Sequence, residues 1–396
     1  MSLECNSAKC NNDRKMKPAT NQSAVYRASM SYLAKCVKQR VCRHAAQQIS
    51  ALPLADLAAE EVALIKGRWN GFGSEYTLLY HRLYKTMCGF DDRWVAEDAY
   101  SPLILRALNP RRYALELSHK ALLPSRYPQI PQPRCVAVCH EGVYYNHTFQ
   151  PIDRQSVAAL LMNEEAFIIK PTSDAMQGRG VRHIHDHTKW DVERLLEEYR
   201  NGFVAQEVVC QSDLTGQFNT HSVNTFRIST LSINGRASLC GILFRCGQGN
   251  TCVDNGTAGG LMVGVDGEGR FLPTAYDKYF NRHTESGNGV KFEGVVIPQM
   301  QHIVDQALSW HSNLMPECGI VGWDIALASD GMPRLIEINL RWPGIVFEQI
   351  CPGQPLFGER TSEVVEYAMQ HSPSLEELVA ERFNINVGRK PTISRE

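Results

Sequence analysis

The chain has 396 residues, with 41 Lys and Arg against 42 Asp and Glu, so its formal net charge is −1. Hydrophobic residues make up 43% and charged residues 21%, which is typical of a globular protein with a large core. The balanced charge argues against general nucleic-acid binding, which requires an excess of basic residues. Because no run approaches the ~18 apolar residues of a membrane helix, we predict no transmembrane segment.

The amino-terminal sequence and the cysteines bear on the cellular compartment. The first twenty residues are polar and lack the apolar centre of a secretory signal. The chain has 13 cysteines, an odd number, and no Cys-x-x-Cys pair. These features predict reduced thiols in a cytoplasmic protein and argue against a disulfide framework or a structural zinc site.

The first part of the chain is predicted to be helical after a disordered tail over residues 1–23, which are rich in Asn, Ser and Lys. Apolar residues recur at helical spacing from Ala24 to Ile49, and further helices are expected over Leu78–Thr86 and Asn109–Lys120. The first of these helices has a basic face. A solvated outer face is the simpler interpretation, and contact with an anionic membrane or nucleic acid is the alternative.

After a proline-rich loop at residues 124–133, short strands alternate with helices. The expected strands are Cys135–Val138, Phe167–Lys170, Val181–Ile184, Phe203–Val209, Asn224–Ile233, Ala237–Arg245 and Gly259–Val265. The expected helices are Thr188–Tyr199, Met300–Leu314, Ser362–Gln370 and Ser374–Phe383. A hairpin is expected between Gly322–Ala328 and Arg334–Asn339, across an Asp-Gly turn. This order predicts an α+β fold in which antiparallel sheet dominates the C-terminal half.

That hairpin carries a candidate metal site. Glu337 and Asn339 are two residues apart on one strand, so their side chains share a face, and the turn brings Asp324 towards them. Two carboxylates and an amide oxygen form a ligand set that suits magnesium. The alternative is a solvated acidic face, because apolar residues occupy the opposite face of the same strand.

Basic residues elsewhere are candidate phosphate ligands. Lys170 ends a buried-type strand before a loop that contains Gly178 and Gly180, which suits an anion site, although a surface lysine is the alternative. Arg227 and Arg245 lie within apolar strands, where a charge is costly unless it is paired. Their partners are either phosphates or carboxylates, for which the sequence offers Asp254, Glu207 and Glu337.

Several motifs occur in a characteristic order between about Gly89 and Ala368: Leu108-Asn-Pro-Arg-Arg, His119-Lys120, Ile168-Ile-Lys-Pro171, Gln206-Glu-Val-Val209, Asn224-Thr-Phe-Arg227, Arg245-Cys-Gly, Val253-Asp-Asn255, Val321-Gly-Trp-Asp324 and Leu335-Ile-Glu-Ile-Asn339. Together they resemble the ATP-grasp superfamily of carboxylate–amine ligases, and within it the sugar-transfer-associated ATP-grasp proteins. The resemblance implies an ATP-grasp fold of two α+β subdomains, 119–205 on the lid side and 206–372 on the catalytic side. A mainly helical region 24–118 would precede them, and a C-terminal helix and tail would occupy 373–396.

The resemblance also implies a role for each candidate residue. Lys120 and Lys170 would hold the phosphates of ATP, and the loop with Ser173, Gly178 and Gly180 would close over them. The segment Gln206, Glu207, Val208 and Val209 would read adenine. Asp324, Glu337 and Asn339 would bind one or two Mg2+ ions. Arg227, Arg245 and His283 would be catalytic, and Asn224, Asp254, Asn255 and Arg341 would lie on the substrate side.

The activity implied by the resemblance is ATP- and Mg2+-dependent amide formation through an acyl phosphate, with ADP and phosphate as products. The substrates would be a small-molecule carboxylate and an amine, with an amino acid or amino sugar used in surface-polysaccharide or secondary-metabolite synthesis. Two alternatives remain open at this point. One is a small-molecule kinase that uses the same ATP site, and the other is a non-catalytic nucleotide-binding module of a polysaccharide-assembly complex. The oligomeric state is not predicted.

Overall fold

A computed structural model describes residues 49–70, 72, 77–172, 180–186, 190–249, 259–341 and 344–372. All of these residues belong to one of the two units into which the chain divides, residues 42–372. The predicted tail 1–23, nearly all of the helix predicted from Ala24 to Ile49, and the helix predicted over Ser374–Phe383 lie outside the described residues. Within the described residues, no helix combines the length and the apolar character that crossing a membrane requires.

The N-terminal part of the described chain is helical, as predicted. Its elements are α2 (Ala59–Arg68), α3 (Thr77–Cys88), α4 (Glu97–Ala99), the π-helical turn η1 (Tyr100–Ile104), α5 (Leu105–Leu108), α6 (Arg111–Leu117) and α7 (Leu123–Arg126). Helix α2 was not predicted, because Ile65 is its one buried residue and its apolar periodicity is therefore weak. Ile65, Tyr100 and Leu105 join a core with Leu231 and Ile320 of the large sheet, so these helices cover one face of that sheet.

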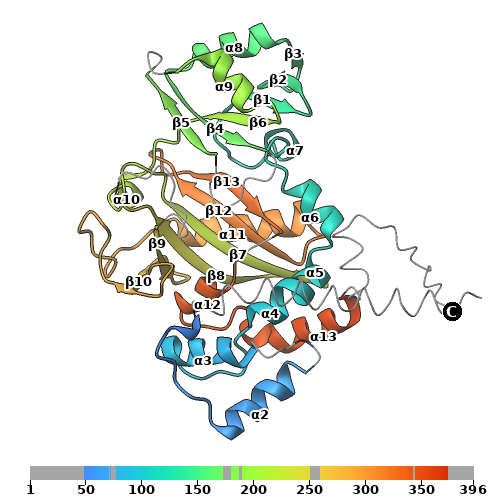
Figure 1. Ribbon diagram of the computed structural model, residues 1–396, viewed down its shortest axis with the longest axis vertical. Helices are drawn as coiled ribbons and strands as arrows, with labels where there is room; N and C mark the ends of the chain where they lie inside the picture. Colours follow the sequence, from blue (N-terminus) through green and yellow to red (C-terminus); the bar gives the residue numbers. More distant parts are fainter. Residues whose placement is uncertain are drawn as a thin grey trace, which may run out of the picture. The chain divides into compact units, whose positions relative to one another are not determined.

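The first sheet has six antiparallel strands in the order β3-β2-β1-β6-β4-β5 (Figure 1). They are β1 (Cys135–His140), β2 (Val143–Asn146), β3 (Pro151–Ile152), β4 (Ala166–Pro171), β5 (Arg182–His185) and β6 (Phe203–Glu207). Helices α8 (Arg154–Met162) and α9 (Val192–Glu198) begin at the capping residues Asp153 and Asp191 and lie side by side on one face. Alternation along the strands therefore turns Lys170 and Gln206 towards the opposite face, which these two helices leave open.

The second sheet has seven antiparallel strands in the order β11-β10-β9-β8-β7-β12-β13. They are β7 (Thr225–Ile233), β8 (Arg236–Cys246), β9 (Leu261–Val265), β10 (Phe271–Tyr276), β11 (Arg282–His283), β12 (Ile320–Leu327) and β13 (Pro333–Asn339). Helix α11 (Met300–Leu314) packs on one face, where Ile303 and Ala307 join Phe226 and Phe244 in a common core. The predicted strands β7 to β9, the helix and the hairpin are confirmed.

The other face of the second sheet carries the C-terminal helices as well as the N-terminal ones. These are α12 (Val346–Ile350), the short 3-10 turn η3 (Gly358–Arg360) and α13 (Thr361–His371), the last of which was predicted as Ser362–Gln370. Helix α12 lies next to the middle of β8 (Figure 1), where a Cβ atom built on Gly241 would be 3.6 Å from the Glu348 carbonyl oxygen. This position brings the side chain of Glu348 next to Arg227 of β7.

The crossing between the two sheets differs from the prediction. The strand predicted to end at Val209 ends at Glu207, so the predicted subdomain boundary at 205/206 falls within β6. The chain leaves the first sheet there because Gln211 and Ser212 already belong to the second, where Gln211 pairs with Ala328 and the Ser212 N–H donates to the Leu327 carbonyl. Val208 and Val209 therefore lie between the sheets in the chain and pair with neither ladder.

Candidate functional site

The pairing of three strands brings the predicted hairpin residues together. Asp324 on β12 lies opposite Glu337 on β13 and, on its other side, opposite Arg227 on β7. The Asn339 side-chain amide donates to the Asp324 carboxylate, with Nδ2 and Oδ2 3.0 Å apart. The convergence of Asp324, Glu337 and Asn339 that was inferred from the turn and the strand period is confirmed.

Asp324 is a buried carboxylate held by two arginines. Arg227 donates from Nε to Oδ1 and from Nη2 to Oδ2, the latter at 3.1 Å, and Arg245 Nη2 lies 2.9 Å from Oδ2. Asp324 and Arg227 are 4% and 8% exposed. Burial alone raises the pKa of Asp324, but the charges and hydrogen bonds of the two arginines outweigh it and lower this pKa to about 2. Asp324 is therefore ionised at neutral pH.

Glu348 is the second carboxylate on Arg227, and sequence reasoning missed it. Its Oε1 lies 3.3 Å from Arg227 Nη1, and the residue is 7% exposed. Burial raises the pKa of Glu348, and the charge of Arg227 opposes this rise. Of the partners considered from sequence, Glu337 and Glu207 form ion pairs with Lys120 and Arg134. Asp254 lies outside the described residues.

Gly322 makes room for Arg227. A Cβ atom at position 322 would lie 3.2 Å from Arg227 Cδ and 3.4 Å from Asn339 Cβ. Both distances are tighter than most real contacts, so a larger residue would push the arginine away from Asp324. The small residue two positions before Asp324 thus lets Arg227 lie across β12.

Lys120 links the hairpin to the open face of the first sheet. Its Nζ lies 3.3 Å from Glu337 Oε1, and the two side chains are 15% and 35% exposed. The next residue, Ala121, is buried against Val138 and Val204 on that open face. The segment around Lys120 therefore contacts both sheets, and its ammonium group lies at the hairpin.

Lys170 and Gln206 form the polar part of the same open face. Lys170 Nζ donates to Gln206 Oε1 at 3.2 Å, and Gln206 Nε2 donates to the Pro133 carbonyl at 3.5 Å. Glu207 accepts from the Arg134 backbone N–H at 2.9 Å, while its own N–H donates to the Arg134 carbonyl. In contrast, among the described residues no hydrogen bond engages the backbone of Val208 or Val209. In the segment predicted to bind adenine, Val208 and Val209 therefore have backbone N–H and C=O groups that bond to no described residue.

Three other predicted site residues lie elsewhere or have structural partners. His283 is on β11, at the opposite edge of the sheet from β13, and its Nε2 lies 3.3 Å from Asp277 Oδ2. Asn224 is fully buried, and its amide donates to the backbone carbonyls of Thr215, in the short helix α10 (Asp213–Gly216), and of Asn219. Arg341 lies two residues after the end of β13 and is exposed. The structure therefore does not bring His283 to the hairpin.

The predicted phosphate loop is described at one end. Gly180 has a φ of +73°, which favours glycine, and its carbonyl accepts a hydrogen bond from the Tyr199 hydroxyl. Ser173 and Gly178, together with the substrate-side candidates Asp254 and Asn255, lie outside the described residues. Their roles remain predictions.

The donor chemistry of the hairpin can be compared with what a magnesium ion requires. Among the described residues, no group of three or more His, Cys, Asp or Glu side chains is placed to hold a metal. The predicted set relies instead on Glu337, which is partly exposed, and on Asn339, whose amide nitrogen turns to Asp324 so that its oxygen faces away. Both suit Mg2+. Asp324 fits as a third ligand if its oxygens bind the metal while they also accept hydrogen bonds from Arg227 and Arg245.

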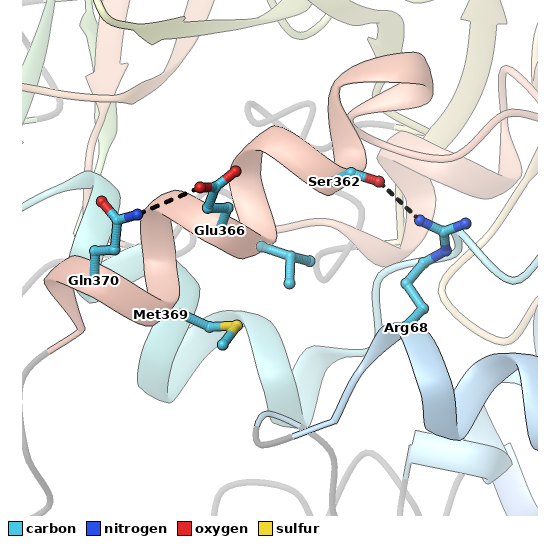
Figure 2. A pocket seen from close by; sticks show the side chains of 6 residues that line it. Arg68, Ser362, Glu366, Met369 and Gln370 are labelled. Atoms are coloured by element: carbon cyan, nitrogen blue, oxygen red, sulfur yellow. Dashed lines mark hydrogen bonds between the residues drawn. The ribbon is translucent and has the colours of Figure 1, made fainter.

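A separate groove of about 440 Å³ lies on the helical side of the molecule (Figure 2). It is lined by residues of α2 and α13, namely Arg68, Ser362, Val365, Glu366, Met369 and Gln370. Arg68 Nη1 donates to Ser362 Oγ at 3.1 Å, so the one guanidinium in the groove is already engaged. The groove contains none of the hairpin residues and does not belong to the site.

The profile of the sugar-transfer associated ATP-grasp family matches residues 103–365, well over half of the chain. This chain belongs to that family. The ATP-grasp fold expected from the motifs is thereby confirmed, and the residues described above from Lys120 to Glu348 all lie within the matched range. No curated protein sequence matches the chain.

Solved structures of similar arrangement include three ligases. An L-amino acid ligase from Bacillus licheniformis is 16% identical, with 66% of this chain and 48% of that chain covered and a TM-score of 0.34. D-alanyl-alanine synthetase A from Vibrio cholerae is 12% identical, with 65% and 66% covered and a TM-score of 0.37. A D-alanine–D-alanine ligase from Helicobacter pylori is 15% identical, with 67% and 62% covered and a TM-score of 0.37. This member of the ATP-grasp family thus spans about half to two-thirds of the length of these proteins.

Proposed function

We propose that this ATP-grasp protein is an ATP- and Mg2+-dependent ligase that joins a carboxylate to an amine through an acyl phosphate, releasing ADP and phosphate. The observation that carries the proposal is the cationic cluster at the hairpin. Arg227, Arg245 and Lys120 surround the carboxylates Asp324 and Glu337 at the place where the family motifs predict the nucleotide phosphates. An ATP site that faces such a cluster can stabilise the negative charge of a phosphoryl transfer.

The acyl phosphate follows from leaving-group chemistry. An amine cannot displace oxide from a carboxylate at neutral pH. Transfer of the γ-phosphoryl group to the carboxylate converts the leaving group into phosphate. The amine then attacks the carbonyl carbon, and phosphate departs. In such a sequence the protein positions the reactants and neutralises developing charge, so no side-chain nucleophile is needed.

The described residues divide this work between the two sheets. On the first sheet, Lys170 is proposed to bind the phosphates, and the backbone groups of Val208 and Val209 are proposed to bind the adenine edge. On the second, Arg227 contacts the γ-phosphate while Asp324 holds its guanidinium in place. Glu337, Asn339 and Asp324 are proposed to hold Mg2+, which when bound neutralises charge on the phosphates.

The remaining roles concern phosphate binding, closure and the acceptor side. Lys120 is proposed to contact the phosphates from the segment that joins the sheets. The loop from Ser173 to Gly180 is proposed to close over the site and exclude water from the acyl phosphate. Arg341 follows the hairpin and is proposed to contact the carboxylate or the amine. Arg245 is proposed to stabilise the oxyanion.

The substrate class rests on the family description. Association with sugar transfer supports an amino acid or amino sugar as one partner, joined in surface-polysaccharide or secondary-metabolite synthesis. The second partner is then a small-molecule carboxylate or amine. The proposal does not extend to nucleic acid, since the chain has no excess of basic residues.

A product screen tests the proposal. Purified protein is incubated with ATP, Mg2+ and pairs of amino acids, amino sugars and uronic acids, while ADP and phosphate release is measured. Mass spectrometry should show a product lighter by one water than the sum of its substrates. A phosphorylated product would instead indicate a kinase. No ADP release with any pair would indicate a nucleotide-binding module.

Glu337→Gln should reduce ADP formation at least about 100-fold, because a carboxylate at the phosphates is lost. Glu268→Gln is the matched control, since Glu268 lies on an exposed turn of the same sheet. It should keep wild-type turnover. Full activity of Glu337→Gln would contradict the metal assignment.

A further inference from the structure

Glu348 has no part in the mechanism above, although it is a buried carboxylate at the edge of the site. We propose that Glu348 is a positioning residue that fixes the orientation of Arg227 and links it to the segment after β13. This inference rests on the proposed function, because it assigns Arg227 to the phosphates. It concerns how that arginine is held, which the family motifs do not specify.

The first line of argument is the hydrogen bonding of the guanidinium. Arginine has five N–H groups in a rigid plane. Arg227 uses Nε and Nη2 for the two oxygens of Asp324, and Nη1 for Glu348. With three of the five groups engaged by described residues, one N–H on each terminal nitrogen remains. These two N–H groups remain for phosphate oxygens.

Asp324 alone would leave the direction of these two N–H groups less defined. A carboxylate on one side of the guanidinium sets its plane through two contacts but comes from the neighbouring strand. Glu348 comes from α12, on a different element, and its contact lies on the far terminal nitrogen. Two carboxylates from two directions hold the plane against tilting, which preorganises the remaining donors.

The second line of argument is the environment of the other carboxylate oxygen. A Cβ atom built on Gly344 would lie 3.6 Å from Glu348 Oε2, so this oxygen is adjacent to the backbone at position 344. The carboxylate thus lies between Arg227 and the segment that follows Arg341.

The third line of argument is charge. A carboxylate that is 7% exposed costs free energy unless it is paired, and Arg227 is its described partner. With two carboxylates beside it, Arg227 attracts the phosphates of bound ATP less strongly than a lone arginine would. Its charge then acts mainly on the negative charge that develops on the phosphoryl group during transfer.

Glu348→Gln provides the test, because glutamine keeps the shape and removes the charge. We expect kcat for ADP formation to fall at least about tenfold while the KM for ATP stays equal or decreases. Glu359→Gln is the matched control. Glu359 lies in η3, on the same face of the second sheet as α12, and its exposed side chain pairs with Arg93. It should leave both constants unchanged. Unchanged constants in Glu348→Gln would overturn the proposal.

A second measurement does not depend on turnover. In protein labelled with ¹⁵N-arginine, the terminal nitrogens of Arg227, assigned by their loss in Arg227→Lys, should show slow rotation in the wild type. In Glu348→Gln their rotation should be faster, and in Glu359→Gln it should be unchanged. Equal rotation in wild type and Glu348→Gln would overturn the proposal, as would a loss of Tm, ATP binding and kcat in parallel. Absence of turnover in the wild type would contradict the proposed function alone.

Discussion

The two sheets of the molecule place their charged side chains differently. On the helices α8 and α9 that cover the first sheet, ion pairs lie at the surface: the side chains of Arg154 and Glu193 are 41% and 60% exposed. In the second sheet, the side chains of Arg227 and Asp324 are only 9% and 6% exposed. They lie on strands β7 and β12, whose other residues are mostly buried and apolar. Both sheets are antiparallel, but helices cover one face of the first sheet and both faces of the second, so charges on the second sheet meet less water.

This difference shows where the chain uses charge for something other than solubility. Exposed pairs contribute little to stability, about 0–1 kcal/mol, and are easily replaced. A buried pair has a large desolvation cost, and apolar residues of similar size often stabilise a protein more. Buried charge in the second sheet is therefore poorly explained by stability. It is well explained by a site that must hold charged groups in a fixed arrangement.

The largest expected effect is that of Asp324→Ala. Removing this carboxylate leaves Arg227 and Arg245 buried without their shared partner, which should cost about 3–5 kcal/mol of unfolding free energy. Glu337→Ala is the comparison, because that side chain is 35% exposed and should cost less than about 1 kcal/mol. Denaturant unfolding measures both. If the two variants were equally stable, the proposed contrast between buried and exposed charge would be wrong.

Sequence reasoning succeeded where the pattern is local. The pairing of the two hairpin strands followed from the Asp-Gly turn, and the convergence of Asp324, Glu337 and Asn339 followed from this pairing and the two-residue period. Helix α11 was predicted to its exact ends, because Met300, Ile303 and Ala307 keep a helical spacing and all are buried.

It failed where the partner is distant in the chain. Glu348 lies 121 positions after Arg227, and no local pattern marks which carboxylate a buried arginine will meet. A lone glutamate in the apolar run Ile345–Ile350 was the available signal. Strands β2, β3, β10 and β11 were also missed. They are short, and most of their residues are not fully buried, so apolar alternation is weak.

An intermediate effect is expected from pH at a neutral buried group of helix α11, which packs on the second sheet. His311 bonds Thr230 through Nδ1 and the Cys318 carbonyl through Nε2, each at 2.8 Å, and burial lowers its pKa from 6.5. Above pH 6.5 the ring is neutral in both states. As the pH falls below 6.5, the unfolded chain takes up a proton that the folded chain resists, so stability decreases.

The slope of unfolding free energy against pH, measured between about 6.5 and 5, tests this contribution. His311→Gln should make the slope smaller. His302→Gln should not do so through burial, because His302 lies on the exposed face of the same helix. An unchanged slope in His311→Gln would show that His311 does not carry the pH dependence.

The smallest effect is expected on the helices that cover the first sheet. Arg154→Ala removes the pair with Glu193 and the contact of Nη1 with the Tyr144 hydroxyl, yet should cost less than about 1 kcal/mol, because these groups remain accessible to water. The loss should shrink further in high salt, since exposed charges are screened. Thermal unfolding at two salt concentrations measures both effects. A loss as large as that of Asp324→Ala would mean that exposure does not separate the two sheets.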